Sequence, residues 1–171
     1  MIQIIPTDTC YGLAWEFCEK DYQDIYRLKG RDFSKQLAFL VRDFGSLREY
    51  AEITDEQITF LKTYPRPWSV ILQKRVIWNL PDFLDKKEYN KISFRVAEVC
   101  IDADIRDNIQ YPLFLTSANL SGNPESKTLV EARGVFLWID GVDGGICDEP
   151  PSDIFEFGED NQIIFFRKNS Q

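Results

Sequence analysis

The chain has 171 residues, of which 44% are hydrophobic and 28% charged, and this composition is typical of one globular domain that builds its core without disulfides or a metal. Its formal net charge of −8 excludes a uniformly basic surface for gripping nucleic acid, although a local basic patch stays open. The absence of histidine excludes Ser-His-Asp and Cys-His catalysis, histidine general bases and histidine-containing metal sites.

The cysteines and the first residues bear on the compartment. The four cysteines, with no CxxC spacing among them, favour free thiols over a zinc cluster or a redox pair; they are Cys10, Cys18, Cys100 and Cys147. The sequence shows no basic segment followed by an apolar run at its start, so no signal peptide is expected. No apolar stretch reaches the roughly 20 residues of a membrane helix. We therefore expect a cytoplasmic protein without a membrane contact.

Hydrophobic patterning predicts one domain over residues 1–171, because no repeat, low-complexity tract or flexible linker interrupts it. Short runs rich in β-branched and aromatic residues predict strands at 2–5, 11–17, 37–41, 68–72, 92–96, 112–115, 135–139, 154–157 and 163–167. Helical spacing predicts helices at 21–28, 44–51, 55–64 and 126–133, the last with Ser126 as its N-cap. Strands mixed with helices in this way predict an α/β or α+β fold around one twisted, mixed sheet.

Residues 6–13, PTDTCYGL, connect the first two predicted strands. A hairpin turn is one interpretation, because Pro, Asp, Thr and Gly all favour turns. The hydroxyls of Thr7 and Thr9, on either side of Asp8, are equally suited to orient a small polar ligand.

A cationic segment, residues 29–35, follows the first predicted helix. Cations near a helix C-terminus interact favourably with the helix dipole, and Gly30 suits a left-handed cap, so a solvated helix end is one interpretation. Phosphate binding is the other, because Lys29, Arg31 and Lys35 gather three cations within seven residues of an acidic chain. The guanidinium of Arg31 can also bind two phosphate oxygens at once.

Residues 113–124, LFLTSANLSGNP, predict a ligand site more strongly than any other segment. An apolar strand runs directly into hydroxyl, amide and glycine residues, and ligands of such sheets bind just beyond strand ends. A simple turn needs one or two of these side chains, whereas this segment carries many. Ser117 offers a small hydroxyl, and Asn119 offers both a donor and an acceptor.

Two lone arginines lie in apolar predicted strands, Arg95 and Arg167. Strand alternation can place either on the solvent face, but an arginine that faces a cleft needs an anionic partner. Ser152, in the turn before a predicted strand, is a weaker candidate. Together the segments predict a site for a nucleotide or another phosphorylated small molecule. No Walker-type or GxGxxG motif accompanies them, which excludes the P-loop and dinucleotide-binding motifs.

In order, these segments resemble the YrdC-like family, the threonylcarbamoyl-AMP synthases and their YciO-type relatives, along essentially the whole chain. The PTxTxYGL and SANxSGxP patterns are the most specific of them. The matching pieces are PTDTCYGL (6–13), KGR (29–31), PRPWSVIL (65–72), FRV (94–96), TSANLSGNP (116–124), PS (151–152) and FR (166–167).

The resemblance implies a single YrdC-like α/β domain whose twisted mixed sheet, flanked by helices, carries a concave ligand cavity. It implies a nucleotidyltransferase that joins L-threonine, bicarbonate and ATP into L-threonylcarbamoyl-adenylate and pyrophosphate. A partner complex would transfer the threonylcarbamoyl group to the adenosine beside the anticodon of tRNA.

By position in these motifs, the resemblance assigns threonine to Thr7, Thr9, Arg95 and Ser152. It assigns ATP, which would enter with Mg²⁺, to Lys29, Arg31, Lys35, Ser117, Asn119 and Arg167. Lys29 and Arg31 would be the catalytic residues, and no residue is assigned as a dedicated metal ligand. Lys29 and Arg31 are expected on a solvent-facing loop, so that replacing either removes activity and leaves the fold intact.

Several residues depart from the family pattern, and they leave two alternatives open. The departures are Asp32, Gln36, Ala97, Glu125 and Asp153. Asp32, Gln36 and Ala97 each replace a proline of the family pattern, and Glu125 replaces a serine. One alternative is a diverged YciO-type paralogue that binds nucleotide or RNA without efficient synthase activity. The other is an RNA-binding module; the charge of −8 argues against tight binding, and weak contact with RNA stays open.

Overall fold

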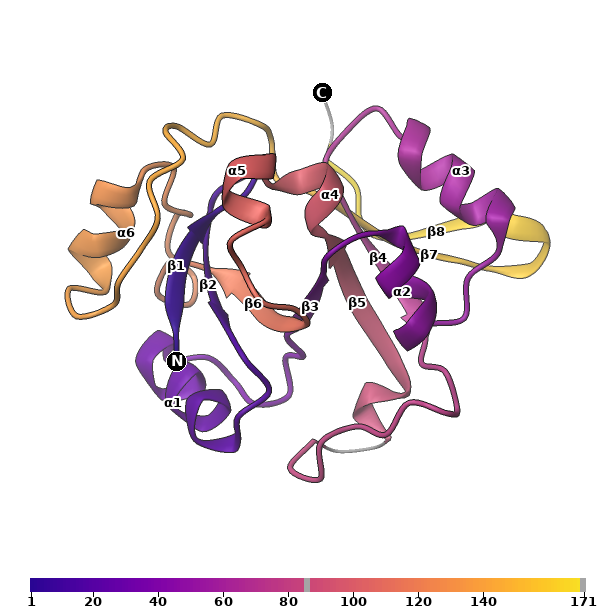
Figure 1. Ribbon diagram of the computed structural model, residues 1–171, viewed down its shortest axis with the longest axis horizontal. Coiled ribbons are helices and arrows are strands. Elements are labelled where there is room, and N and C mark those ends of the chain that lie inside the picture. The colour runs from indigo at the N-terminus through magenta and orange to yellow at the C-terminus, as the bar shows by residue number, and fades with distance from the viewer. Residues whose placement is uncertain (85–86, 170–171) are drawn as a thin grey trace.

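One mixed β-sheet organises the chain in this computed structural model, which describes residues 1–84 and 87–169 (Figure 1). Its strand order is β1-β2-β6-β3-β5-β4-β7-β8, and β3–β5 and β4–β7 are the parallel neighbours. The other neighbours are antiparallel. The strands are β1 (Gln3–Pro6), β2 (Tyr11–Trp15), β3 (Ala38–Val41), β4 (Trp68–Gln73), β5 (Lys91–Val96), β6 (Leu113–Ser117), β7 (Asp153–Phe157) and β8 (Ile163–Arg167). The predicted fold class is confirmed.

The helices flank this sheet (Figure 1). They are α1 (Glu19–Lys29), α2 (Phe44–Tyr50), α3 (Asp55–Thr63), α4 (Ala97–Cys100), α5 (Ala103–Arg106) and α6 (Leu129–Val135), with 3-10 turns at Glu88–Asn90 and Glu159–Asn161. Thr54 begins α3 with a capping box, in which its hydroxyl and the side chain of Gln57 each bond the other's backbone N–H. In the part of the chain described, every helix is too short or too polar to cross a bilayer.

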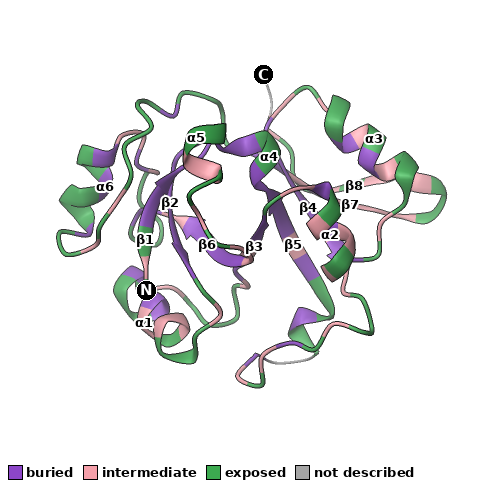
Figure 2. Ribbon diagram, viewed as in Figure 1, coloured by how far each residue is buried: buried purple, intermediate pink, exposed green. Residues whose placement is uncertain are grey.

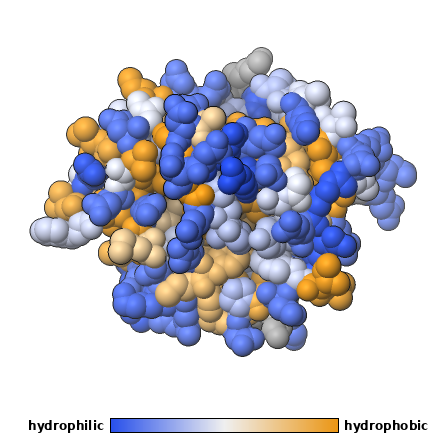
Figure 3. Space-filling model, viewed as in Figure 1, coloured by the Kyte–Doolittle hydropathy of each residue, from blue (hydrophilic) through white to orange (hydrophobic). Residues whose placement is uncertain are grey.

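Apolar side chains fill both faces of the sheet, because neighbouring residues of β6 point to opposite sides. Phe114 is fully buried in the larger core, where its ring lies 5.4 Å from Trp15, 4.5 Å from Phe17 and 5.1 Å from Phe39 between centroids. Leu113 and Leu115, on either side of Phe114 in the sequence, pack into a second cluster under α4 and α5. Figure 2 shows the resulting burial along the central strands, and Figure 3 shows hydrophilic side chains over most of one face.

The strand predicted at 135–139 is wrong. Val135 is the last residue of α6, and residues 136–139 form a turn. Phe136 is buried against the core, whereas Leu137 and Trp138 are 71% and 95% exposed. A β-rich composition does not make a strand when no neighbouring strand is present to pair with it. The four-residue helices α4 and α5 were not predicted, since one turn has too little periodicity to detect.

The predicted N-cap of α6 is also wrong. The helix begins at Leu129, and Thr128 caps it by accepting a hydrogen bond from the N–H of Glu131, whose carboxylate accepts one from Thr128 in return. Ser126 instead donates its hydroxyl to the carbonyl of Ala118 at 2.6 Å. The side chain of Ser126 therefore closes a loop and does not start the helix.

The ring cluster around Phe114 predicts a large loss of stability on truncation. Replacing Phe114 by alanine should lower the free energy of unfolding by about 3–5 kcal/mol, because a cavity replaces a fully buried ring. Phe166, on β8, is 63% exposed and provides the matched control, for which about 0.5 kcal/mol or less is expected. Urea denaturation of both variants measures the difference, and equal losses would contradict this account of the core.

Candidate functional site

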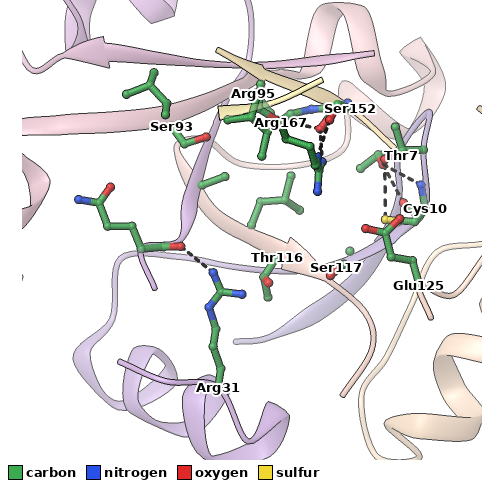
Figure 4. Close-up of a pocket in the computed structure, with 18 residues that line it drawn as sticks. Thr7, Cys10, Arg31, Ser93, Arg95, Thr116, Ser117, Glu125, Ser152 and Arg167 are labelled. Carbon is green, nitrogen blue, oxygen red and sulfur yellow. Dashed lines mark hydrogen bonds between the residues drawn. The ribbon is translucent and has the colours of Figure 1, made fainter. Parts of the chain in front are cut away.

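A pocket of about 330 Å³ lies on the sheet between segments that are far apart in sequence (Figure 4). The sheet order makes this convergence necessary, because it sets β2 beside β6 and β4 beside both β5 and β7. The polar residues that line it are Thr7, Thr9, Cys10, Arg31, Gln36, Ser69, Ser93, Arg95, Thr116, Ser117, Glu125, Ser152 and Arg167.

Small side chains at paired positions hollow the floor of the pocket. Gly12 pairs with Ser117, and Ala38 pairs with Leu115. A Cβ at Gly12 would lie 2.7 Å from Cδ1 of Leu115, so only glycine fits here without a shift of that side chain. Ser93, opposite Ile71, continues the floor on β5 and β4. The pocket therefore depends on sheet register, since these residues share a face only when strands pair as they do.

Arg95, on β5, faces the pocket rather than bulk solvent. Its residue is 5% exposed, and its guanidinium forms an ion pair with Asp8 from the β1–β2 turn. The backbone N–H of Asp8 donates to the carbonyl of Cys100 at 2.8 Å, which fixes the turn that carries the carboxylate. Of the two positions that strand alternation allowed, Arg95 therefore takes the one that faces the cleft. The buried cation has the anionic partner that burial requires.

Arg167 and Ser152 form the wall contributed by β7 and β8. Arg167 donates from Nε to the carbonyl oxygen of Ser152 at 2.9 Å and from Nη2 to its hydroxyl at 3.0 Å. The Ser152 hydroxyl lies 3.2 Å from that of Ser69 on β4. Although Arg167 is exposed at its outer side, these two bonds direct its guanidinium along the pocket (Figure 4).

Arg31 lies in the loop after α1, whose backbone folds around its guanidinium. Nε donates to the carbonyl of Lys35 at 3.2 Å, and Nη2 donates to that of Gln36 at 2.8 Å. Arg31 and Gln36 line the pocket, whereas Lys35 is exposed and its side chain is not part of the lining. The cationic segment therefore contributes one guanidinium to the wall and one ammonium to the neighbouring surface.

The expectation that Lys29 lies on a solvent-facing loop is wrong. Lys29 is the last residue of α1 and only 2% exposed, because the loop after β6 covers it. Its ammonium donates to the carbonyl of Asn119 at 2.6 Å, to Oδ1 of the same residue at 3.2 Å and to the carbonyl of Ser117. Burial, and secondarily the charge of Arg31, lower the pKa of Lys29 to about 8. Three oxygen acceptors oppose this by favouring the charged form.

Ser117 and Asn119 are held together by the same network. The Ser117 hydroxyl donates to Oδ1 of Asn119 at 2.6 Å, and Nδ2 of Asn119 donates to the carbonyl of Asn123 at 2.6 Å. Ser117 lines the pocket, whereas Lys29 and Asn119 lie behind the lining. The predicted site residues thus fall into an inner group that meets the pocket and an outer group that holds Ser117.

Thr7 and Cys10 lie across the pocket from Arg31 (Figure 4), and Thr9 lines the same pocket. The Thr7 hydroxyl donates to the carbonyl of Cys10 at 2.7 Å and lies 3.3 Å from the Thr9 hydroxyl. Burial and the charge of Glu125 raise the pKa of the Cys10 thiol to about 11. The thiol therefore stays protonated at neutral pH, and this wall supplies hydrogen bonds rather than a nucleophile.

Six polar lining residues were not predicted as site residues: Cys10, Gln36, Ser69, Ser93, Thr116 and Glu125. The two serines lie in otherwise apolar strands, at positions that share the pocket face with Ile71 and Arg95. Small polar residues at alternate positions of a buried strand were the available signal. Gln36 and Glu125 were noticed only as departures from a family pattern.

The departures from that pattern are accommodated in the structure. Ala97 is buried as the first residue of α4, and Asp32 accepts a hydrogen bond from the N–H of Ser34 at 2.9 Å. Asp153 is fully buried and accepts hydrogen bonds from Tyr64 at 2.7 Å and from the N–H of Asn169 at 2.8 Å. These three side chains each have a local role, so the loss of the family residue does not open the fold at these positions.

Comparison with known proteins identifies relatives of the whole chain. A family model for Sua5, YciO and YrdC proteins, described as "Telomere recombination", matches residues 1–168. A relative from Methanocaldococcus jannaschii, provisionally named a threonylcarbamoyl-AMP synthase, is 36% identical over 98% of this chain and 79% of its own. The threonylcarbamoyl-AMP synthase of Rattus norvegicus is 28% identical over 85% of this chain. This chain spans about half, 53%, of that mammalian relative.

Solved structures share the fold. P. abyssi Sua5 complexed with L-threonine superposes with a TM-score of 0.76 and 21% identity, over 97% of this chain and 49% of that one. E. coli YciO gives a TM-score of 0.77 and 18% identity, over 98% of this chain and 82% of that one. Both confirm the arrangement of sheet and helices.

The contacts of the Lys29 ammonium predict that Lys29 is required for stability. In Lys29→Ala the carbonyls of Ser117 and Asn119 lose a buried donor, so the free energy of unfolding should fall by about 2 kcal/mol or more. Arg27, exposed on the same last turn of α1, provides the control, and Arg27→Ala should change stability by less than about 1 kcal/mol. Urea denaturation tests both; a fully stable Lys29→Ala protein would contradict the assignment.

The lowered pKa of Lys29 also predicts a pH dependence. Below pH 8 the ammonium is protonated in both states, but between pH 8 and about 10.5 only the unfolded chain keeps the proton. The unfolding free energy contributed by Lys29 should therefore rise with pH across this window and level off above it. The difference between wild type and Lys29→Met, followed from pH 7 to 10.5, isolates this contribution from other titrating groups. A difference independent of pH would show that the acceptors keep the pKa of Lys29 near its ordinary value.

Proposed function

The chain belongs to the Sua5/YciO/YrdC family, and from this premise we propose that it catalyses the synthesis of L-threonylcarbamoyl-adenylate and pyrophosphate from L-threonine, bicarbonate and ATP. The curated relatives with this activity in their names support the proposal. So does the P. abyssi structure, whose fold this chain shares and which holds L-threonine.

The observation that carries the proposal is the convergence of three arginines on one pocket of an acidic chain. Arg31, Arg95 and Arg167 come from a loop and two non-adjacent strands, and all three line the pocket. ATP, bicarbonate and an amino acid all carry negative groups, so their reaction needs positioning and charge neutralisation above all. Guanidinium groups supply both without a histidine base, which this chain lacks.

For threonine, the proposal uses the wall of Thr7, Thr9, Arg95 and Ser152. Arg95 is the counter-ion for the substrate carboxylate. Asp8 and the Cys100 thiol engage part of its guanidinium, and the remaining donors are left for the substrate. The hydroxyls of Thr7, Thr9 and Ser152 can donate to or accept from the substrate hydroxyl.

For ATP, the proposal uses Arg31, Ser117 and Arg167 as contacts with the nucleotide and its phosphates. Lys29 and Asn119 act one step behind, since their hydrogen bonds hold the backbone and hydroxyl of Ser117. Lys35, exposed beside Arg31, adds positive charge at the phosphate end. Arg31 and Lys29 remain the residues on which the reaction depends most, the first through contact and the second through support.

Mg²⁺ is proposed to enter with ATP. Among the described residues, no group of three or more acidic, cysteine or histidine side chains is arranged to hold a metal ion. Mg²⁺ commonly binds through substrate phosphates, waters and one or two carboxylates rather than through a preformed protein cage. The donor set therefore fits a metal delivered on phosphate oxygens, and when bound it would neutralise charge on the leaving pyrophosphate.

We propose that a tRNA threonylcarbamoyl-transferase complex receives the reaction product. Direct contact with RNA is expected to be weak, because the net charge is −8. The diverged-paralogue alternative is less favoured, because its YciO-type relative shares the fold at only 18% identity, whereas the archaeal relative reaches 36%.

An end-point assay tests the proposal. The protein is incubated with ATP, Mg²⁺, L-threonine, bicarbonate and pyrophosphatase, and threonylcarbamoyl-adenylate is sought by mass spectrometry. Product that requires both threonine and bicarbonate is expected. Arg31→Ala should lower its rate by about 10²- to 10³-fold, because a charge that stabilises the transition state is lost.

Arg27→Ala is the matched control for the assay, because Arg27 is exposed on α1 and is not part of the pocket lining. Its rate should equal that of the wild type. Folded protein that binds ATP and forms no product would overturn the proposed activity in favour of the paralogue. An undiminished rate in Arg31→Ala would instead overturn the assignment of the site.

A further inference from the structure

Glu125 is the single acidic residue among those that line the pocket in residues 1–84 and 87–169. It faces a space that is otherwise walled by three arginines, hydroxyl groups and apolar side chains. Nothing in the roles proposed above uses it. A carboxylate in a site built to bind anions opposes that binding unless it meets a positive group of its own.

The backbone on either side of Glu125 is fixed. The hydroxyl of Ser126 donates to Ala118, and the carbonyl of Ser126 accepts from the N–H of Tyr11 at 2.9 Å. The ammonium of Lys127 donates to the carbonyl of Thr9. These bonds attach the segment after β6 to the β1–β2 turn, so Glu125 is held beside the turn that carries Thr7 and Cys10.

The carboxylate of Glu125 has no hydrogen-bond partner in spite of this anchoring. It takes part in no hydrogen bond or ion pair with the residues that the structure describes, and it is half-buried. The nearby Cys10 thiol is affected by its negative charge and, in the opposite direction, by the positive charges of Lys127 and Arg95. The same carboxylate favours the charged form of the buried Lys29 ammonium, against the larger effect of burial on the pKa of Lys29.

A free amino acid carries a carboxylate and an ammonium group on one carbon atom. Its binding site needs one positive and one negative group, because a buried charge without a partner is costly. Arg95 meets the first requirement. On the same wall, Glu125 is the one acidic lining residue available for the second.

We propose that Glu125 binds the α-ammonium group of the amino-acid substrate and thereby selects a substrate with a free amine. This inference rests on the proposed function and adds to it a residue that recognises the substrate nitrogen. The bond is charge-assisted and forms in a partly desolvated pocket, where such bonds are stronger than in water.

A metal ligand is the competing role for a carboxylate without a hydrogen-bond partner. Figure 4 shows Glu125 beside Cys10 and Thr7, with Arg31 on the far side of the pocket. The experiment below distinguishes the two roles.

Calorimetric titration of the intact chain with two ligands tests the inference. The first ligand is L-threonine, and the second is 2,3-dihydroxybutanoate, in which a hydroxyl replaces the amine. The wild type should bind threonine more tightly than the analogue. In Glu125→Gln the affinity for threonine should fall about 10- to 100-fold, while the affinity for the analogue changes little, because only the charged bond is lost.

Glu16→Gln is the matched control, since it removes the same charge at an exposed position outside the pocket. It should retain the wild-type preference for threonine. Titration of Glu125→Gln with a non-hydrolysable ATP analogue and Mg²⁺ verifies that the variant folds, and its affinity should equal that of the wild type. Glu125→Asp should restore part of the preference.

Three outcomes would overturn the inference and leave the proposed function standing. They are unchanged threonine affinity in Glu125→Gln, an equal loss for both ligands, and a loss confined to the Mg²⁺–nucleotide, which would make Glu125 a metal ligand. A wild-type chain that binds nucleotide but not threonine would overturn the proposed function itself, and with it this inference.

Discussion

The buried ammonium of Lys29 is the interaction on which the site depends. It joins the end of α1 to the loop after β6, two segments that the sheet alone would leave apart. Burying an ammonium group is costly unless its donors are all bonded, and here they meet the oxygens of Ser117 and Asn119. The same cation thus closes the wall of the pocket and sets the orientation of Ser117. A residue that looks like a direct phosphate ligand acts first as part of the scaffold.

The positive charges of the pocket are also held in place by neighbouring groups. The chain carries a net charge of −8, yet three arginines line one pocket. Asp8 pairs with Arg95, while the backbone carbonyls and the hydroxyl of the pocket wall hold Arg31 and Arg167. Because backbone carbonyls and a hydroxyl carry no net charge, two of the three cations keep their full charge for a ligand. An acidic protein can therefore present a locally positive site.

Much of the fold could be predicted from the sequence, because strands and helices with strong hydrophobic periodicity can be recognised within a short segment. The failures lie where tertiary contacts decide. Residues 136–139 have a β-rich composition but no strand to pair with, and Ser126 closes a loop while Thr128 caps the helix. The site was predicted in part, because the motifs contain Thr7, Arg31 and Ser117. Ser69 and Ser93 were missed, because only the pairing of the strands shows that their side chains face the pocket.

The sequence by itself determined the fold class, the family and the segments that form the site, because motif spacing and hydrophobic periodicity are properties of the chain. Only the tertiary structure decided which side chains meet the pocket. Burial separated Lys29 from Arg31, two residues apart in sequence, and strand register turned Arg95 inward. The tertiary structure also brought Glu125 to the wall that holds Thr7 and Cys10. These outcomes depend on contacts between segments about 90 to 120 residues apart, which local sequence does not encode.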